Sequence, residues 1–156
     1  MLFRSLQQKQ WAGVFHRPLQ GVSLENVQPR LRMTVLMAFA NEGDRLLLNT
    51  SNKSEIAAGY ATLYGDSAGA LAVLGDLVKH QVYSLARHLN QRHGAELIPA
   101  RVLERAPSAE LRENQTDQDT LPPYDHLDAM VRLAVEQTTG PQAWADRKST
   151  RLNSSH

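Results

Sequence analysis

The sequence has no cysteine among its 156 residues, so it can form neither a disulfide nor a metal site with thiolate ligands. The 17 basic and 16 acidic residues nearly cancel, and without a strong basic stripe we expect no binding to nucleic acid. The longest apolar stretch, around residues 35–40, is far shorter than the roughly 20 residues that a membrane-spanning helix needs. The beginning of the chain also lacks the long apolar core of a secretory signal. We therefore expect a cytoplasmic protein that binds neither nucleic acid nor membranes.

At this length the chain makes at most one domain with a single core. Two short apolar runs, Arg45–Leu48 and Leu71–Leu74, are too short for helices and predict two buried strands. Apolar spacing and turn residues predict helices around and between these strands, which favours an α/β fold. The predicted helices are a short one before Pro18, then 24–41 with Pro29 in its first turn, 55–60, one that starts at Lys79, 100–104 and 124–137.

The stretch from residue 45 to residue 66 is the most informative part of the chain. A strand there leads into a polar turn and then a short helix, and ligands of open α/β sheets lie at the carboxyl ends of strands. Residues 50–55 offer a hydroxyl, an amide, an ammonium and a carboxylate within six positions. That mixture suits a ligand with phosphate and metal. The alternative is an ordinary polar turn in which Ser51 or Asn52 caps the helix.

Three blocks of sequence carry a resemblance to one family. They are 49–66, NTSNKSEIAAGYATLYGD; 107–125, from PSAEL through NQTDQD to LPPYD; and 25–32, ENVQPRLR. Taken in chain order, the three blocks resemble NAD synthetases, in particular the glutamine-dependent, two-part kind, over most of residues 25–136. The resemblance implies a partial Rossmann-like adenine nucleotide α-hydrolase fold, a parallel sheet with flanking helices, truncated to the C-terminal part of the synthetase domain.

The resemblance also implies a reaction. The nicotinate carboxylate of deamido-NAD would attack the α-phosphate of ATP, with Mg²⁺ as the metal, and ammonia would then displace AMP to give NAD. In two-part enzymes the ammonia comes from glutamine, released by a glutaminase domain that this sequence lacks. Ammonia is itself the nucleophile, so we assign no residue as a catalytic acid or base. The family further implies a homo-oligomer in the parent enzyme, with the first long helix at the subunit contact.

Residue roles follow from the same resemblance. Asn26 and Arg30 stand one turn apart on one helix line, and an arginine fork can hold a phosphate or carboxylate in a fixed plane. Glu55 offers the hard oxygen ligand that magnesium prefers. The implied ATP-binding residues are Thr50, Lys79 and Ser108, the implied deamido-NAD-binding residues are Asn26, Arg30 and Glu55, and the implied metal ligand is Glu55.

Two loops complete the expected site. Tyr64-Gly65-Asp66 resembles a loop folded over a nucleotide, although an ordinary turn has the same composition. The proline-bounded stretch 106–123 is long for a structureless connection, and such loops are functional or disordered; the resemblance favours a functional one, with residues 115–117 lining the site. By contrast, the three histidines at 80, 88 and 93 share no helix face, so we expect surface positions and no metal site.

The sequence divides into a poorly defined segment 1–23, the synthetase part 24–145, and residues 146–156. Residues 146–156 resemble a translated sequencing-library adapter, so we expect them to be a non-native tail. The sequence also lacks the Ser-Gly-Gly-x-Asp-Ser loop with which the resembled enzymes bind pyrophosphate. Two alternatives therefore stay open: an inert or merely nucleotide-binding fragment, and another member of the ATP-pyrophosphatase superfamily.

Overall fold

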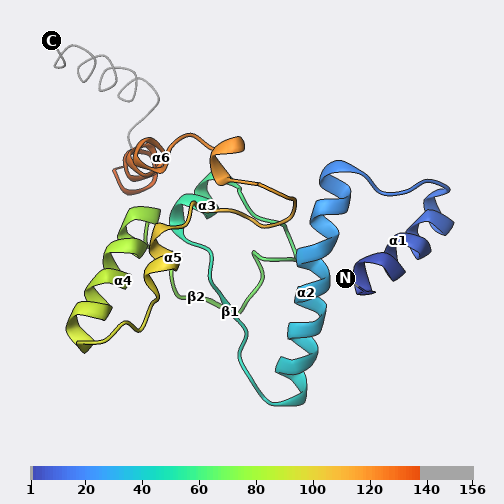
Figure 1. Cartoon of the computed structure of the whole chain (residues 1–156), viewed down its shortest axis with the longest axis horizontal. Helices are drawn as coiled ribbons and strands as arrows, with labels where there is room; N and C mark the ends of the chain where they lie inside the picture. Colours follow the sequence, from blue (N-terminus) through green and yellow to red (C-terminus); the bar gives the residue numbers. More distant parts are fainter. Residues whose placement is uncertain (1, 138–156) are drawn as a thin grey trace, which may run out of the picture.

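The computed structural model describes residues 2–137, and of residues 2–8 only the backbone. Helices dominate and two short strands lie between them (Figure 1). The predicted tail, 146–156, lies outside the described residues. The elements are α1 Leu2–Phe15, α2 Gly21–Glu42, β1 Leu48–Asn49, α3 Lys53–Ala58, β2 Leu71–Ala72, α4 Lys79–His93, α5 Ala100–Glu104, a 3₁₀ turn Asp117–Asp119, α6 Tyr124–Val131 and a π-helical turn Arg132–Glu136.

The two strands pair in parallel, with Leu48 opposite Leu71, and α3 lies in the connection between them. This is the parallel α/β arrangement that the sequence predicts. The strands are, however, only two residues long each, and the prediction that they are buried is wrong. Leu48 is 46% exposed and Leu71 54% exposed, because the two-stranded sheet of the described residues leaves these side chains uncovered.

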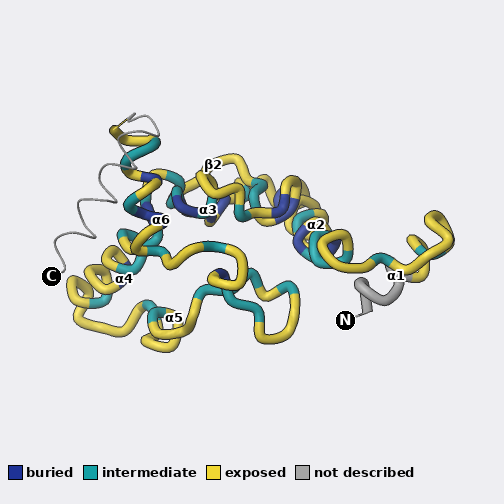
Figure 2. The backbone as a smooth tube through the Cα atoms, turned by 90° about the horizontal axis from the view of Figure 1, so that it is seen from above, coloured by how far each residue is buried: buried dark blue, intermediate teal, exposed yellow. Residues whose placement is uncertain are grey.

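The core lies where α3, α4 and α6 meet, on one side of the strands (Figure 1). Val78, just before α4, packs with Leu127 and Val131 of α6, and Tyr124 covers this cluster. The buried positions concentrate in the turn that leads into α3, in α6 and in the first half of α2, whereas α5 and most loops are exposed (Figure 2). This small cluster therefore fixes how the beginnings of α3 and α4 face each other.

Helix α2 lies on the far side of the strands from α4 (Figure 1). It begins at Gly21, three residues before the predicted start, so Pro29 is inside the helix and the prediction of a first-turn position is wrong. Pro29 is buried and touches the turn at Gly65, where an added Cβ would lie 3.0 Å from the Pro29 Cβ. Pro29 has no N–H to donate within the helix, and its ring packs against this turn.

Helix α3 begins and ends two residues before the predicted range 55–60, because the Asn52 cap starts the helix at Lys53 and Gly59 ends it. The other helices follow the predictions closely. Helix α4 begins at Lys79, α5 spans the predicted residues 100–104, and the predicted last helix is α6 with its π-helical extension to Glu136. Helix α1 ends at Phe15, before Pro18 as expected. Within residues 2–137, no helix combines the length and apolarity that crossing a membrane requires.

Candidate functional site

The beginning of α3 is held by a reciprocal cap. The Asn52 side chain accepts a hydrogen bond from the backbone N–H of Glu55 at 3.0 Å, and Oε2 of Glu55 accepts one from the backbone N–H of Asn52 at 3.1 Å. This capping box satisfies two N–H groups that an open helix end would leave unpaired. The capping alternative raised by the sequence is therefore correct for Asn52, but it occupies only one oxygen of Glu55.

The other oxygen of Glu55 binds Lys79. Glu55 Oε1 lies 2.8 Å from Lys79 Nζ, and the two side chains are only 20% and 16% exposed. Lys79 is the first residue of α4, where the helix dipole disfavours a positive charge. The carboxylate of Glu55 offsets that charge. Two residues implied in ligand binding, one for ATP and one for the metal, thus meet across the beginnings of two helices.

Lys79 also connects this pair to a buried carboxylate on the loop before α6. Its Nζ lies 5.1 Å from the ring centre of Tyr124, within the range of a cation–π contact. The Tyr124 hydroxyl donates a hydrogen bond of 2.6 Å to Oδ2 of Asp117. Burial of Tyr124 and this hydrogen bond to Asp117 raise the pKa of the phenol far above its usual value. Asp117, expected to line the site, is 3% exposed.

Two polar atoms beside this connection remain unsatisfied. Asp117 Oδ1 and the Tyr60 hydroxyl are both buried without a hydrogen-bond partner in the described part of the chain. Burial, followed by the negative charge of Asp117, raises the pKa of Tyr60. Both phenols therefore keep their protons to a higher pH than a free tyrosine does, and one carboxylate on the 106–123 loop faces them.

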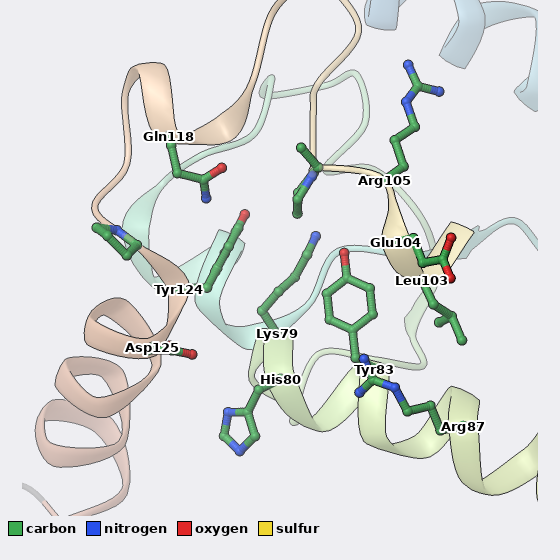
Figure 3. A pocket seen from close by; sticks show the side chains of 13 residues that line it. Lys79, His80, Tyr83, Arg87, Leu103, Glu104, Arg105, Gln118, Tyr124 and Asp125 are labelled. Carbon is green, nitrogen blue, oxygen red and sulfur yellow. The ribbon is translucent and has the colours of Figure 1, made fainter. Parts of the chain in front are cut away.

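A pocket of about 360 Å³ opens next to Lys79. In Figure 3, Lys79 lies between Tyr124 and Tyr83, and the polar ends of the three side chains point the same way. Pro107 and Gln118 of the 106–123 loop line its wall, whereas residues 115–117, which the resemblance places at the site, are not among the lining residues. The neighbouring Ser108 is half-buried, and its Oγ accepts a hydrogen bond from the Glu110 backbone at 3.1 Å. The lining residues are Lys79, His80, Tyr83, Arg87, Leu103, Glu104, Arg105, Ala106, Pro107, Gln118, Pro123, Tyr124 and Asp125.

A second group of candidate residues lies on α2. Asn26 Oδ1 accepts a hydrogen bond of 2.9 Å from the Thr62 hydroxyl, and Arg30 Nε donates one of 3.1 Å to the Leu63 carbonyl. Both residues therefore hold the loop that follows α3. That loop is ordered around Thr62, which is 4% exposed and whose N–H donates to Asp66 Oδ1 at 2.6 Å. The structure thus brings Asn26 and Arg30 together against the Tyr64-Gly65-Asp66 turn.

The candidates consequently fall into two pairs and two separate residues. Glu55 lies with Lys79, and Asn26 lies with Arg30. Thr50 is exposed just after β1, and Ser108 lies beside the pocket wall. In the described ranges, no group of three or more histidine, aspartate or glutamate side chains is placed to hold a metal ion.

Sequence reasoning missed Tyr60, Tyr124 and Asp128. Asp128 is 2% exposed and lies on α6 between the buried Leu127 and Val131. A carboxylate within an apolar helix stripe was the available signal, because such a residue is rarely buried without partners. The two tyrosines gave no such signal, since an aromatic near a helix end is common.

Comparison with known proteins gives one consistent result. The family model of NAD synthase matches residues 4–154. The chain is 46% identical over 135 residues to a glutamine-dependent NAD(+) synthetase of Thermotoga maritima, covering 86% of this chain and 23% of the relative. It is 53% identical over 116 residues to that of Xanthomonas campestris pv. campestris, covering 74% of this chain and 21% of the relative. The chain thus spans less than a quarter of the length of these relatives.

Solved structures show the same likeness. An NMN synthetase from Francisella tularensis superposes with a TM-score of 0.69 at 32% identity, over 80% of this chain and 50% of that one. A glutamine-dependent NAD+ synthetase from Acinetobacter baumannii, in complex with adenosine diphosphate, gives 0.61 at 34% identity, over 93% of this chain and 25% of that one.

Proposed function

The chain belongs to the NAD synthase family, and we propose that it is part of a glutamine-dependent ligase that forms NAD from deamido-NAD and ATP. Its fold is part of the Rossmann-like adenine nucleotide α-hydrolase fold. The pyrophosphate-binding loop and the glutaminase domain would belong to other parts of the enzyme. We further propose a cytoplasmic location and a homo-oligomeric parent.

The Glu55–Lys79 ion pair is the observation that carries this proposal. A magnesium–ATP complex presents a metal cation beside phosphate anions. Glu55 and Lys79 offer the complementary charges: a carboxylate for the metal and an ammonium for a phosphate. On binding, Lys79 would exchange the carboxylate for a phosphate oxygen, and Glu55 would exchange the ammonium for the metal. Both side chains are partly buried, and an uncompensated charge at such a position is costly. The exchange gives each charge an opposite partner both before and after binding.

The hard oxygen of Glu55 fits magnesium. When bound, that metal would neutralise phosphate charge and so favour attack at the α-phosphate. Lys79 would bind the phosphates, and Thr50 and Ser108 would donate hydrogen bonds to ATP. Asn26 and Arg30 would hold deamido-NAD, beside the loop that they already fix. The role of these residues is to position two substrates, which can supply a large part of a rate enhancement without a general base.

The competing functions predict different results in a turnover assay. The similarity to an NMN synthetase makes the deamido precursor of NMN the natural competing substrate. Another ATP-pyrophosphatase activity would show as turnover with a different acceptor only. A fragment that merely binds nucleotide, or is inert, would show no turnover in any context.

A segment replacement tests the proposal. Residues 4–145 would replace the matching segment of the Thermotoga maritima relative, and NAD formation from deamido-NAD and ATP would be measured with ammonium or with glutamine. We expect turnover with either nitrogen source, and a loss of roughly 100-fold or more in Glu55→Gln. Asp76→Asn, an exposed change of the same kind before α4, is the matched control. A folded hybrid without NAD formation would contradict the proposal.

A further inference from the structure

A buried carboxylate on α6 connects the beginnings of α3 and α4. Oδ1 of Asp128 accepts a hydrogen bond from the hydroxyl of Ser54, and Oδ2 accepts one of 2.9 Å from the backbone N–H of His80. Nδ1 of His80 also lies 2.8 Å from Oδ2. Asp128 is 2% exposed and Ser54 is fully buried. Both oxygens are therefore used inside the protein.

The Ser54 hydroxyl extends this network to Lys79. Its Oγ accepts a hydrogen bond of 3.0 Å from the backbone N–H of Lys79 while its own hydrogen is donated to Asp128. Two first-turn N–H groups of α4, which have no partner within the helix, are thus satisfied by Ser54 and Asp128. The negative charge also lies at the favourable end of the helix dipole.

The residues held by this network are the immediate neighbours of the ion pair. Ser54 precedes Glu55 on α3, and the fixed N–H groups are those of Lys79 and His80. We propose that Asp128 is a positioning residue that sets Glu55 opposite Lys79 for binding magnesium–ATP. This inference rests on the proposed function for its ligand, but the geometry that it explains belongs to this chain alone.

The first test measures the coupling between Glu55 and Lys79 in the 156-residue chain. A double-mutant cycle with Glu55→Gln and Lys79→Met gives their interaction from urea unfolding. The cycle is repeated in Asp128→Asn. This change keeps the size of the side chain but replaces one carboxylate oxygen with an NH₂ donor, although the facing groups, the Ser54 hydroxyl and the His80 N–H, are themselves donors. We expect the coupling to fall by at least about twofold, and to stay unchanged in Asp76→Asn. Unchanged coupling in a destabilised Asp128→Asn would assign Asp128 a purely structural role and overturn the proposal.

Ser54→Ala is the second variant, in case Asp128→Asn does not fold. It removes the connection to the Lys79 backbone but leaves Asp128 bonded to His80. A reduced Glu55–Lys79 coupling in Ser54→Ala supports the proposal, and full coupling overturns it. Neither measurement depends on NAD formation, so they stand or fall separately from the proposed function.

The second test uses the hybrid enzyme. With Asp128→Asn we expect the KM for ATP to rise by about tenfold and the KM for glutamine to stay the same, because only the phosphate side of the site is displaced. Asp128→Glu should not restore the wild-type KM, since a longer side chain cannot keep both bonds. An unchanged KM for ATP would overturn the positioning role. If the hybrid with Asp128 unchanged shows no activity, that result instead counts against the proposed function.

Discussion

Glu55 uses its two carboxylate oxygens for two different purposes. Oε2 accepts the hydrogen bond that closes the cap of α3 at Asn52, and Oε1 lies 2.8 Å from Nζ of Lys79 at the beginning of α4. A ligand can replace the ammonium at Oε1 without disturbing the cap. The residue that closes the cap of α3 is therefore also able to exchange its ion-pair partner, so one short turn serves both folding and the proposed binding of magnesium–ATP.

Glu55→Gln tests the contribution of this arrangement to stability. The change removes the charge that offsets Lys79 but keeps the size of the side chain. Because the pair is mostly buried, we expect a loss of about 1–2 kcal/mol in the free energy of unfolding, measured by urea denaturation. Glu113→Gln, at an exposed position, is the control. Equal losses in the two variants would mean that the ion pair adds nothing to the free energy of unfolding.

Alkaline titration tests the environment of Tyr60 and Tyr124, which are both half-buried. The folded pKa values of Tyr60 and Tyr124 are raised above 10, by burial and by the carboxylate of Asp117. An unfolded chain would release these protons near pH 10, so their stabilising effect is complete below that pH and is lost above it. We expect two of the four tyrosines to ionise late, together with unfolding, in absorbance at 295 nm. Tyr124→Phe should leave a single late tyrosine; four ordinary titrations in the wild type would refute the buried contacts.

Acid titration tests the lowered pKa values of two surface carboxylates, Asp119 and Glu136. Hydrogen bonds from the backbone and hydroxyl of Thr116 lower the pKa of Asp119, and a hydrogen bond from Lys53 lowers that of Glu136. A lowered folded pKa stabilises the protein above the unfolded pKa, so this stabilisation should be lost as the pH falls below about 4.5. Asp119→Asn should make the loss of thermal stability with acid shallower than in the wild type. An identical pH dependence would show that Asp119 does not contribute.

Gly69→Ala tests the close packing of the strands. Gly69 has φ +152, and an added Cβ would lie 2.5 Å from the backbone nitrogen of Asn49 in β1. Neither strand can move without losing the hydrogen bond between Ala70 N–H and the Leu47 carbonyl. We expect a loss of about 2–4 kcal/mol in the free energy of unfolding. Gly13→Ala in α1, where an added Cβ meets nothing, should be neutral or stabilising; similar losses in both would contradict this packing.

The sequence was sufficient where local signals decide the structure. The start of α4 at Lys79, the bounds of α5 and the cap at Asn52 follow from apolar spacing and side-chain chemistry within a few residues. The pairing of Asn26 with Arg30 on one face also followed from helix geometry.

It was insufficient where distant residues decide. The strands were expected to be buried because short apolar runs usually are, but Leu48 and Leu71 remain uncovered in the described chain. Nothing local to Pro29 indicates that α2 starts at Gly21, so the sequence predicts a first-turn position for Pro29 that the structure does not have. Asp128 binds Ser54 across 74 residues, a relation that no local pattern contains. The ligand-binding roles of the six candidate residues remain predictions.

Isothermal titration of this chain with magnesium–ATP and deamido-NAD tests whether Glu55 and Lys79 form a preformed part of the site. The wild type should bind, Glu55→Ala should weaken binding by at least about tenfold, and Asp76→Asn should bind like the wild type. A folded wild-type chain that binds neither ligand, or a Glu55→Ala variant that binds equally well, would show that this ion pair is not a preformed part of the site.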